Sequence, residues 1–277
     1  MTRLAQPDPV IVLGASGRLG RGLRHQWQDH SRAVWQARGQ AANVQWSPGQ
    51  PWPGPRRARA IVALWGVVPG KGALADNTVL ALAAQDLALQ LGAERVLHCS
   101  SAAVYAPAPA PQAEEAANPQ SDYGHAKLAM EQALQDWAGE HPEGPAFCAM
   151  RIGNVAGADS AFAAIARGGP VTMDRFADGG GPRRSYLSHA MLAQAVDALL
   201  SCPLSSLPRV VNLADRGVID MADLVRAAGR ALLWNDTGRT GSTITLDLAC
   251  LSRLTPPLAA DITRLLADGA FLAGENP

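Results

Sequence analysis

Short apolar runs recur along much of the chain, and several of them end at a glycine or another turn residue. The first run, Val10–Leu13, stops at Gly14, which predicts a buried strand that enters a turn. The same pattern predicts further strands at Ala33–Ala37, Ala60–Trp65, Arg95–Cys99, Ala146–Ile152 and Arg209–Leu213. Helices are expected between these runs, at Arg18–Gln26, Thr78–Leu91 and Tyr123–Trp137.

Strands and helices alternate from residue 10 to about residue 152. This alternation predicts a parallel sheet covered by helices on both faces, a doubly wound α/β fold of the Rossmann type. The alternation breaks over 156–184 and again after 213, where we expect a small C-terminal substrate-binding lobe over the carboxyl edge of the sheet. The predicted domains are therefore a Rossmann core at 8–155, to which 186–214 returns, and a lobe made of 156–185 and 215–277.

The composition argues against several classes of partner. Of the 277 residues 48% are hydrophobic, and 24 basic residues balance 24 acidic ones, so no uniform field attracts a nucleic acid or an anionic membrane. No apolar run is long enough to span a bilayer and no signal peptide is recognisable, so we expect a cytoplasmic protein. The four cysteines are widely spaced, which predicts buried thiols and neither a disulfide framework nor a metal site.

A glycine-rich turn joins the first predicted strand to the first predicted helix. A turn without bulky side chains lets backbone N–H groups approach a pyrophosphate, and the helix N-terminus adds partial positive charge. Glycines here can also serve close packing alone, but their position in the first βα turn favours a dinucleotide site. The predicted cofactor-binding residues of this turn are Gly14, Ser16, Gly17, Arg18, Leu19 and Gly20.

The end of the second strand bears on the choice between NAD and NADP. Sites that prefer NAD carry an acidic residue there, which binds the ribose 2′-hydroxyl. No acidic residue occurs between Asp29 and Asp76, and Arg38 follows the strand instead. Because a guanidinium suits a 2′-phosphate, the sequence slightly favours NADP over NAD. The alternative is that Arg38 is one more solvated arginine in an arginine-rich chain.

Tyr123 and Lys127 lie four residues apart, so that a helix carries them on one face. A phenol with a pKa near 10 exchanges protons poorly at neutral pH, and lowering that pKa by about three units takes about 4 kcal/mol of anion stabilisation. We expect a partly desolvated Lys127 and the positive charge of an oxidised nicotinamide to supply it. Tyr123 would then act as general acid or base. The alternative is an exposed helical pair without a catalytic role.

Two hydroxyl groups, of Ser100 and Ser101, follow the strand predicted at Arg95–Cys99. The carboxyl ends of the strands form the edge of the sheet at which open α/β folds bind ligands. One hydroxyl at that edge can donate a hydrogen bond to a substrate oxygen and stabilise the charge that develops on it. Both serines are therefore candidates for contact with the substrate.

Four segments together resemble the extended short-chain dehydrogenase/reductase family, also called the NAD-dependent epimerase/dehydratase family. They are GASGRLG at 14–20, SSAAVY at 100–105, YGHAK at 123–127 and RIGNVAG at 151–157. The resemblance implies a catalytic set of Ser101, Tyr123 and Lys127, in which Lys127 also holds the nicotinamide ribose, while Ser100 stays a substrate-binding candidate. It further implies cofactor contacts at Leu64, Trp65, Gly66, Asn77 and Ile152, and substrate contacts at Asn154 and Arg184.

The chain also departs from the family pattern. The family's adenine-reading aspartate is replaced by the basic stretch Arg56–Arg59, and Trp65 is larger than the usual residue beside the cofactor. Both departures weaken the expectation of tight cofactor binding. The sugar-nucleotide dehydratases carry Asp-Glu directly after the catalytic hydroxyl, where this chain has Ala102 and Ala103. Because alanine cannot transfer protons, dehydration by that route is not expected.

The leading hypothesis is an NAD(P)-dependent oxidoreductase or epimerase that transfers hydride to or from a sugar or sugar-nucleotide alcohol or ketone. Its partner would be a small carbohydrate-like substrate, and the resemblance implies a possible homodimer. The alternative is a non-catalytic NADP(H)-binding sensor or scaffold module on the same fold. The bulk of Trp65 favours that alternative, whereas the intact serine, tyrosine and lysine set opposes it.

Overall fold

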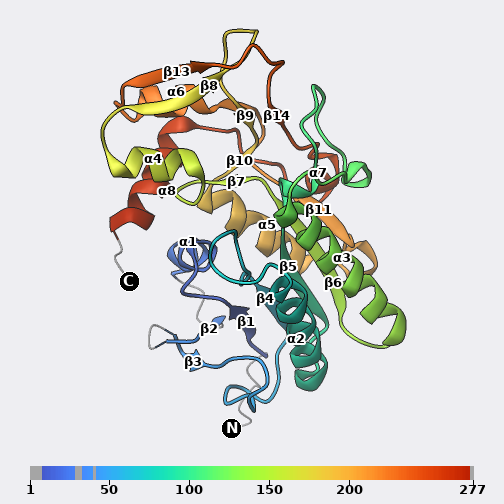
Figure 1. Ribbon diagram of the computed structural model, residues 1–277. Coiled ribbons are helices and arrows are strands. Elements are labelled where there is room, and N and C mark those ends of the chain that lie inside the picture. The colour runs from blue at the N-terminus through green and yellow to red at the C-terminus, as the bar shows by residue number, and fades with distance from the viewer. Residues whose placement is uncertain (1–7, 29–32, 40–41, 275–277) are drawn as a thin grey trace.

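A central sheet of seven parallel strands dominates the computed structural model, which describes residues 8–28, 33–39 and 42–274 (Figure 1). The strand order is β11-β6-β5-β4-β1-β2-β3, so the chain moves outward from β1 to one edge and then returns to build the other half. Ligands of such sheets bind where the order reverses, here beside β1 and β4. The bounds are β1 Val10–Leu13, β2 Ala33–Ala37, β3 Val44–Gln45, β4 Ala60–Ala63, β5 Arg95–Ser101, β6 Ala146–Ile152 and β11 Val210–Leu213.

Helices cover both faces of the sheet, which confirms the predicted doubly wound fold (Figure 1). Along β1, Val10 and Val12 pack with the helices of one face, whereas Ile11 and Leu13 pack with those of the other. This alternation follows from the two-residue period of a strand. The helices are α1 (Arg18–Gln26) and α5 (His189–Ser201) on the first face, and α2 (Asp76–Leu91) and α3 (Asp122–Glu140) on the second.

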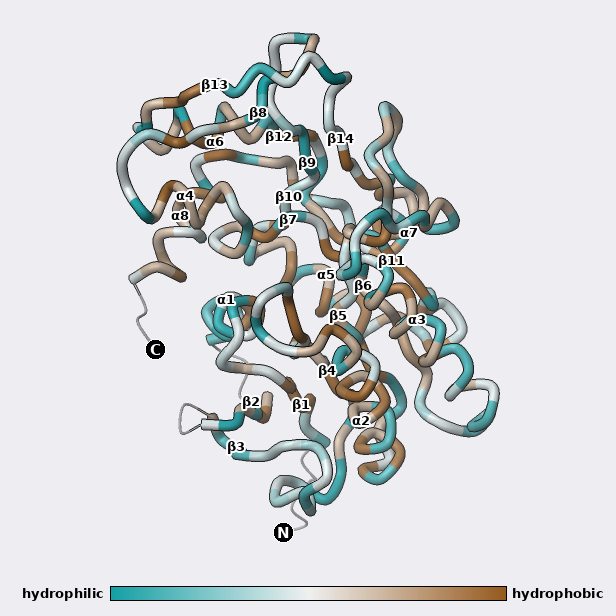
Figure 2. The backbone as a smooth tube through the Cα atoms, viewed as in Figure 1, coloured by the Kyte–Doolittle hydropathy of each residue, from teal (hydrophilic) through white to brown (hydrophobic). Residues whose placement is uncertain are grey.

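The predicted elements of the core agree closely with the observed ones. The strands at β1, β2 and β6 and helix α1 have the predicted bounds, and α2 and α3 begin one or two residues earlier than predicted. The strand expected at 60–65 ends at Ala63, and the two-residue strand β3 was not predicted. Hydrophobic residues, brown in Figure 2, run along the central sheet, as the apolar runs of the sequence indicate.

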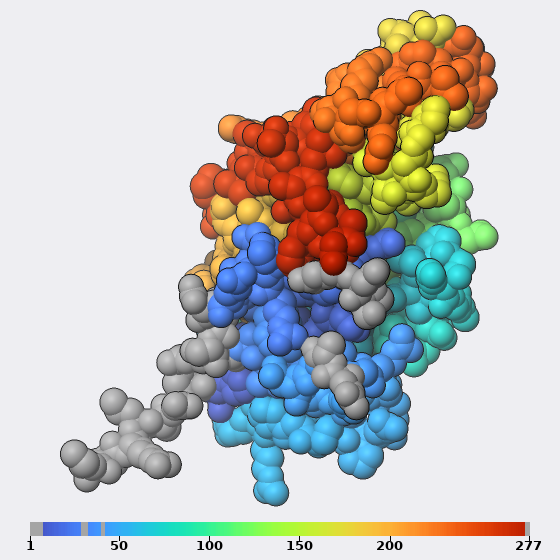
Figure 3. Space-filling model, turned by 90° about the vertical axis from the view of Figure 1, so that its left-hand side faces the viewer, coloured from blue at the N-terminus to red at the C-terminus, as the bar shows by residue number. Residues whose placement is uncertain are grey.

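A second buried cluster lies beyond the carboxyl edge of the sheet and forms a lobe of its own. It joins α4 (Ser160–Arg167), α6 (Met221–Ala227) and α8 (Ile262–Gly274) to the paired strands β8 (Val171–Arg175) and β13 (Leu232–Asp236). Helix α8, red in Figure 3, also packs against α1. The remaining elements are β7 Asn154–Val155, β9 Arg183–Arg184, β10 Tyr186–Leu187, β12 Ile219–Asp220, β14 Thr243–Ile244, α7 Ala249–Leu254 and the short 3-10 helices η1 Ala102–Val104, η2 Glu114–Ala116 and η3 Leu204–Ser206.

The C-terminal segment contributes to both parts of the molecule. Leu251 of α7 is buried in the cluster that fills the α1 and α5 face of the sheet, whereas Leu265 of α8 is buried in the lobe. We therefore propose, as the sequence predicts, that 8–155 and 186–214 form the core and that 156–185 and 215–277 form the lobe. None of the helices in the described part of the chain is long and apolar enough to cross a membrane.

A buried histidine in the sheet makes the stability of the fold depend on pH. His98 of β5 is 1% exposed, its Nε2 lies 3.3 Å from Oε1 of Gln85, and burial lowers its pKa from 6.5 to about 3. At pH values between these two pKa values, the His98 imidazole binds a proton in the unfolded chain but not in the folded chain. Stability is therefore lost as the pH falls from 6.5 towards 3, by about 1.4 kcal/mol per pH unit from this group.

We predict that His98→Gln reduces this acid sensitivity. Between pH 7 and pH 5 the wild type should lose about 2 kcal/mol more of its free energy of unfolding than the variant does. Urea unfolding at the two pH values measures the difference, and each protein serves as its own reference at pH 7. An equal loss in both proteins would show that His98 does not carry the effect.

Candidate active site

Helix α3 carries the predicted tyrosine and lysine to the end of β5. Ser121 caps the helix, because its Oγ accepts a hydrogen bond from the N–H of Gly124 at 3.1 Å. The cap sets the start of the helix at Asp122, so Tyr123 lies in the first turn and Lys127 in the second. Gly124 makes this approach possible, since a Cβ there would overlap the carbonyl oxygen of Ala103 in η1.

Lys127 lies in the interior, with 2% of its surface exposed. Its Nζ donates a hydrogen bond to the carbonyl oxygen of Cys99 at 2.8 Å and lies 5.9 Å from the centre of the Tyr123 ring. Burial lowers the pKa of Lys127, and the nearby Cys99 and Glu131 side chains act in the opposite direction. An ammonium group is thus held between the end of β5 and the tyrosine.

The third predicted catalytic residue lies at the same place. Ser101 ends β5, its Oγ accepts the N–H of Ala103 at 3.1 Å, and its hydroxyl acts on the phenol of Tyr123 by lowering the pKa. The structure therefore brings Ser101, Tyr123 and Lys127 together at the carboxyl edge of the sheet. A hydroxyl, a phenol and an ammonium in this arrangement can bind a substrate oxygen and exchange a proton with it.

The protonation of Tyr123 differs from the expectation in the absence of ligands. Burial raises the pKa of its phenol above the usual value, and the neighbouring Cys99 adds to this effect. The hydrogen bond with Ser101 acts in the opposite direction but does not outweigh burial. At neutral pH Tyr123 is therefore a proton donor. The predicted lowering of this pKa involves both Lys127 and the positive charge of an oxidised nicotinamide, and it stays a prediction for the protein with its cofactor bound.

Ser100 does not face the site as predicted. Its side chain is 1% exposed, and its Oγ donates a hydrogen bond to Oε1 of Glu131 at 2.5 Å. Ser100 is turned into the buried interface with α3, whereas Ser101 is the last residue of β5 and caps η1 at the carboxyl end of the strand. We therefore withdraw Ser100 from the substrate-binding residues.

The glycine-rich turn connects the end of β1 to the N-terminus of α1. Gly14 has a φ of 85°, and its N–H donates a hydrogen bond to Oε1 of Gln36 at 3.0 Å. A Cβ at Gly20 would overlap the carbonyl oxygen of Gly14, so the helix can approach the turn only with glycine there. Ser16, Gly17 and Arg18 are exposed and Leu19 is half-buried. This geometry fits a dinucleotide pyrophosphate at the N-terminus of α1.

Arg18 links the turn to the lobe. Its Nη1 donates a hydrogen bond to the carbonyl oxygen of Ala158, in the loop that follows β7, at 3.0 Å. The predicted pyrophosphate turn and the predicted substrate lobe therefore meet through this side chain. Arg38 lies directly after β2 and is exposed, so its guanidinium is accessible to solvent and to a ligand.

Aromatic side chains line the outer half of this edge of the sheet. Trp65 follows β4 and its ring stacks on that of Trp46, with centroids 5.8 Å apart. The side chain of Gln36 connects them to the turn, because its Nε2 donates to the carbonyl oxygen of Trp46 at 2.5 Å. Within the described residues, Nε1 of Trp65 is buried without a hydrogen-bond partner. A buried indole N–H without a partner is costly, and a bound ligand could accept its hydrogen bond.

The loop after β4 lies beside the lysine. A Cβ at Gly66 would come within 3.0 Å of Oδ1 of Asn77 and 3.3 Å of Nζ of Lys127. Asn77 holds this loop, since its side chain exchanges hydrogen bonds of 2.9–3.1 Å with the backbone of Val67. Leu64 is buried in the core. Gly66 and Asn77 therefore lie between the glycine-rich turn and the catalytic set, as contact with a cofactor would require.

The predicted cofactor residue Ile152 and the predicted substrate residue Asn154 lie where the lobe joins the sheet. Ile152 ends β6 and is buried, and Nδ2 of Asn154 in β7 donates to Oδ2 of Asp159 at 2.8 Å. Tyr186 of β10 donates to the same carboxylate oxygen at 2.5 Å. Asp159 also caps α4. Asn154 thus has a structural partner, and its amide is held in one orientation.

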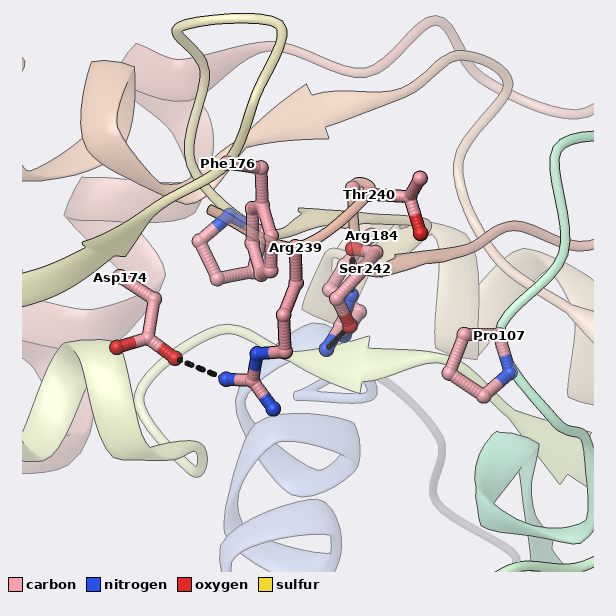
Figure 4. Close-up of a pocket in the computed structure, with 9 residues that line it drawn as sticks. Pro107, Asp174, Phe176, Arg184, Arg239, Thr240 and Ser242 are labelled. Carbon is pink, nitrogen blue, oxygen red and sulfur yellow. Dashed lines mark hydrogen bonds and ion pairs between the residues drawn. The ribbon is translucent and has the colours of Figure 1, made fainter. Parts of the chain in front are cut away.

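A cavity of about 610 Å³ opens in the lobe next to Arg184 (Figure 4). Nη1 of Arg184 donates to the carbonyl oxygen of Ser242 at 2.6 Å, and burial lowers its pKa. Arg239 lies across the cavity, where its Nη2 is 3.2 Å from Oδ2 of Asp174. The cavity is lined by Pro107, Asp174, Phe176, Pro182, Arg184, Arg239, Thr240, Gly241 and Ser242.

Several residues of this region were not predicted from the sequence. Arg239 and Ser242 lie more than fifty residues after Arg184 and meet it only because β14 pairs with β9. Gln36 carried no signal, because a glutamine at the end of a strand is unremarkable in a sequence. Glu131 lies four residues after Lys127, so the helical period could have identified it. Among the described residues no cluster of three or more histidine, cysteine, aspartate or glutamate side chains could hold a metal ion.

The fold resembles those of solved sugar-nucleotide enzymes over almost its whole length. One is MoeE5 in complex with UDP-glucuronic acid and NAD, with a TM-score of 0.76 and 19% identity over 96% of this chain and 99% of that one. Another is the UDP-N-acetylglucosamine 4-epimerase from Bacillus cereus, with a TM-score of 0.75 and 15% identity over 96% and 99% of the chains. At sequence identities this low, the structural similarity establishes a common fold and no more.

A third similar structure is TunA, an NAD dependent NDP-hexosamine 5,6-dehydratase involved in tunicamycin biosynthesis. Its TM-score is 0.71, with 17% identity over 97% of this chain and 98% of that one. Because this relative is a dehydratase, the comparisons do not support the expectation that dehydration is excluded. The solved structures that resemble this chain include several with NAD bound, and a preference for NADP has no support among them.

Two further comparisons, with curated proteins and with models of protein families, bear on the family of this chain. None of the curated proteins matches the chain significantly. The model of the NAD dependent epimerase/dehydratase family, however, matches residues 64–214, which is more than half of the chain. This span contains the whole catalytic set, and the match confirms the resemblance seen in the sequence motifs. The chain belongs to the NAD dependent epimerase/dehydratase family.

Proposed function

We propose that this protein is an NAD(P)-dependent oxidoreductase or epimerase that acts on an alcohol or ketone of a sugar nucleotide. The observation that carries the proposal is the meeting of Ser101, Tyr123 and Lys127 at the carboxyl end of β5. A protein that only binds a dinucleotide could use Lys127 to hold the nicotinamide ribose, but it has no need for the Ser101 hydroxyl and the Tyr123 phenol beside that ammonium. Burying a lysine costs free energy, so this arrangement points to a chemical role.

The nicotinamide of a bound cofactor would supply or accept the hydride, and the residues of the chain would handle the proton. Tyr123 donates its proton to the carbonyl oxygen of a ketone, because burial keeps the phenol protonated at neutral pH. Ser101 donates a hydrogen bond to the same oxygen and stabilises its developing charge. Lys127 supplies positive charge next to the phenolate that results. In the direction of oxidation the phenol must first lose its proton, which requires additional positive charge near the ring.

Two groups of residues would hold the cofactor. The turn from Gly14 to Gly20 fits the pyrophosphate, and Gly66 and Asn77 lie beside Lys127, where the nicotinamide ribose would bind. Leu64, Trp65 and Ile152 stay proposed contacts along the path between them. Arg38 supports a slight preference for NADP, because its exposed guanidinium can bind a 2′-phosphate.

The cavity at Arg184 supports a diphosphate as part of the substrate. The Arg184 guanidinium donates hydrogen bonds to the carbonyl oxygens of Arg183 and Ser242 and to the Ser242 hydroxyl, so no carboxylate among the described residues is bonded to it. The carboxylate of Asp159 acts on its charge without a hydrogen bond. Burying such a charge is costly without an anion. The second guanidinium, of Arg239, is shared with Asp174. A nucleoside diphosphate sugar, as bound in the MoeE5 structures, fits this requirement.

We predict that Arg184→Gln weakens the binding of UDP-glucose by at least about tenfold, since a charge-assisted hydrogen bond contributes about 1.5–3 kcal/mol. Calorimetric titration measures the affinity, and the affinity for NAD should not change. The matched control is Arg183→Gln, because Arg183 pairs with Asp178 at 2.7 Å and does not line the cavity. Equal effects of the two substitutions would count against a diphosphate at Arg184.

The function is tested by combining ligand binding with hydride transfer. Thermal unfolding with NAD, NADP and a panel of UDP-sugars identifies ligands, because a ligand at a hundredfold excess over its Kd stabilises the protein by about 2.7 kcal/mol. Each stabilising pair is then assayed by nicotinamide absorbance and by product analysis, which also detects an epimer. Stabilisation by a dinucleotide without turnover of any sugar nucleotide would reject the enzyme in favour of the alternative below.

The second candidate is a non-catalytic sensor or scaffold that binds NADP(H). The bulk of Trp65, whose ring stacks on that of Trp46, favours it, because it departs from the smaller residue that the family pattern places beside the cofactor. Dehydration is a further proposal that the same product analysis would detect. The homodimer also stays a prediction, and sedimentation of the purified chain measures it.

A further inference from the structure

Three successive residues at the end of β5 each contact a different side chain of α3. The carbonyl oxygen of Cys99 accepts from Lys127 at 2.8 Å, and the side chain of Ser101 bonds Tyr123. Between them, Oγ of Ser100 donates to Glu131 at 2.5 Å. The catalytic set uses the first and third of these contacts. The second contact, of Ser100 with Glu131, has no role in the mechanism described above.

Glu131 is the centre of a buried ion pair. Its carboxylate is 7% exposed and binds the guanidinium of Arg151 through two nitrogens, at 2.7 Å from Nη2 and 3.1 Å from Nε. Arg151 belongs to β6, directly beside Ser100 in the register of the sheet, and it is 4% exposed. A bidentate pair of this kind fixes both the distance and the orientation of its partners.

The network continues away from the catalytic set. Nη1 of Arg151 donates to the Tyr105 hydroxyl at 2.9 Å, and that hydroxyl donates to Oδ1 of Asn212 at 2.7 Å. The backbone N–H of Asn212 donates to Oε1 of Glu114 at 2.9 Å. This network connects helix α3 to β5, β6 and β11 through buried polar contacts, in addition to the apolar packing of the core. Breaking such a network is expensive, because each buried group would lose its partner.

We propose that Glu131 is a positioning residue of the active site: through Ser100 and Arg151 it fixes α3 against the end of β5, and its carboxylate keeps the buried Lys127 ammonium charged. Lys127 and Glu131 are one helical turn apart. The other titratable groups that act on Lys127 are His98 and Cys99 of β5, and the ring of Tyr123 lies beside its Nζ. Of these groups, Glu131 is the one that offers Lys127 a negative charge at neutral pH, and the positive guanidinium of Arg151 is paired with the same carboxylate.

The experiment uses the unusual lysine content of the chain, which has only Lys71 and Lys127. Lysine labelled with ¹³C next to the amine gives two NMR signals, so the titration of Lys127 can be followed directly. In Glu131→Gln the Lys127 signal should titrate at a pH lower by on the order of one unit, because an opposite charge nearby is lost. The signal of Lys71, which is exposed, should not move.

The matched control is Glu140→Gln, which removes an exposed carboxylate from the same helix and should leave the Lys127 titration unchanged. Because Glu131→Gln leaves Arg151 without its partner and could unfold the chain, a second variant combines it with Arg151→Gln. That double variant removes the positive charge of Arg151 together with the negative charge of Glu131, so its Lys127 should titrate below the wild type but above Glu131→Gln. If Lys127 titrates as in the wild type in whichever variant folds, the proposal is overturned.

The proposal rests on the proposed function only for the statement that Lys127 serves catalysis. The titration needs neither substrate nor cofactor, so its outcome is independent of the hydride-transfer assay. Turnover by the wild type together with an unmoved Lys127 signal would overturn the role of Glu131 and leave the enzyme intact. A shifted Lys127 signal in a protein without turnover would reject the proposed function and leave the charge coupling intact.

Discussion

Replacing Tyr123 with phenylalanine is expected to lower the rate of hydride transfer by about a thousandfold and to leave the affinity for the dinucleotide unchanged. The substitution removes only the hydroxyl group, which the mechanism uses to donate the proton, and general acid catalysis contributes about 10²–10⁴-fold. The ring stays, so its packing against Lys127 and the cap at Ser121 are retained. Steady-state kinetics and calorimetric titration with NAD measure the two quantities separately.

The comparison variant is Ser101→Ala, which removes the hydrogen bond to Tyr123 but no proton donor. Its rate should fall by less than that of Tyr123→Phe, since it loses stabilisation of the substrate oxygen only. Were Tyr123→Phe to keep more than about a tenth of the wild-type rate, the assignment of the general acid would be wrong. Loss of dinucleotide affinity in the same variant would instead indicate a role of the phenol in binding.

Replacing Gly124 with alanine is expected to destabilise the fold and to inactivate the site. Alanine usually stabilises a helix relative to glycine by about 1 kcal/mol, but here the added Cβ would overlap the carbonyl oxygen of Ala103, which belongs to the backbone and cannot turn away. Helix α3 must then move off η1, at a cost of about 1–3 kcal/mol for overpacking. Because a displacement of about 1 Å can cost about a hundredfold in rate, turnover should fall with Tyr123 still present.

Gly139→Ala is the matched control on the same helix. A Cβ at Gly139 meets no atom within 4 Å, so only the helical preference of alanine acts there. Its free energy of unfolding should rise by up to about 1 kcal/mol, whereas that of Gly124→Ala should fall. Chemical unfolding of the two variants compares the signs directly. A stabilised Gly124→Ala with normal turnover would show that the contact of α3 with η1 is not tight.

Much of the core was predictable because its pattern is local. Val10–Leu13 is apolar at every position and ends in a glycine, which indicates a buried strand whatever lies beside it. The four-residue spacing of Tyr123 and Lys127 fixes their common face through the helical period alone. The glycine-rich turn is likewise local, since the need for glycine at residue 20 comes from the overlap of a Cβ with the turn itself.

The tertiary structure showed that one of two neighbouring serines is turned away from the site. The strand pattern offers Ser100 and Ser101 alike and the family resemblance selects Ser101 for the catalytic set, but only the fold shows that Ser100 bonds Glu131 in the interior. It also decided the direction in which the pKa of Tyr123 moves. The sequence supplies a lysine one turn away, but only the fold shows that the phenol is buried, and this burial raises its pKa in the protein without ligands.

The sequence by itself determined most strands of the central sheet, the helices α1, α2 and α3, the dinucleotide turn and the tyrosine–lysine pair, because each depends on residues that are near one another along the chain. Only the tertiary structure determined the Glu131 and Arg151 pair and the cavity shared by Arg184 and Arg239. These join residues 20 and 55 positions apart, which no helical or strand period relates. Charge and burial are properties of the assembled fold, since both depend on which distant elements exclude water from a side chain.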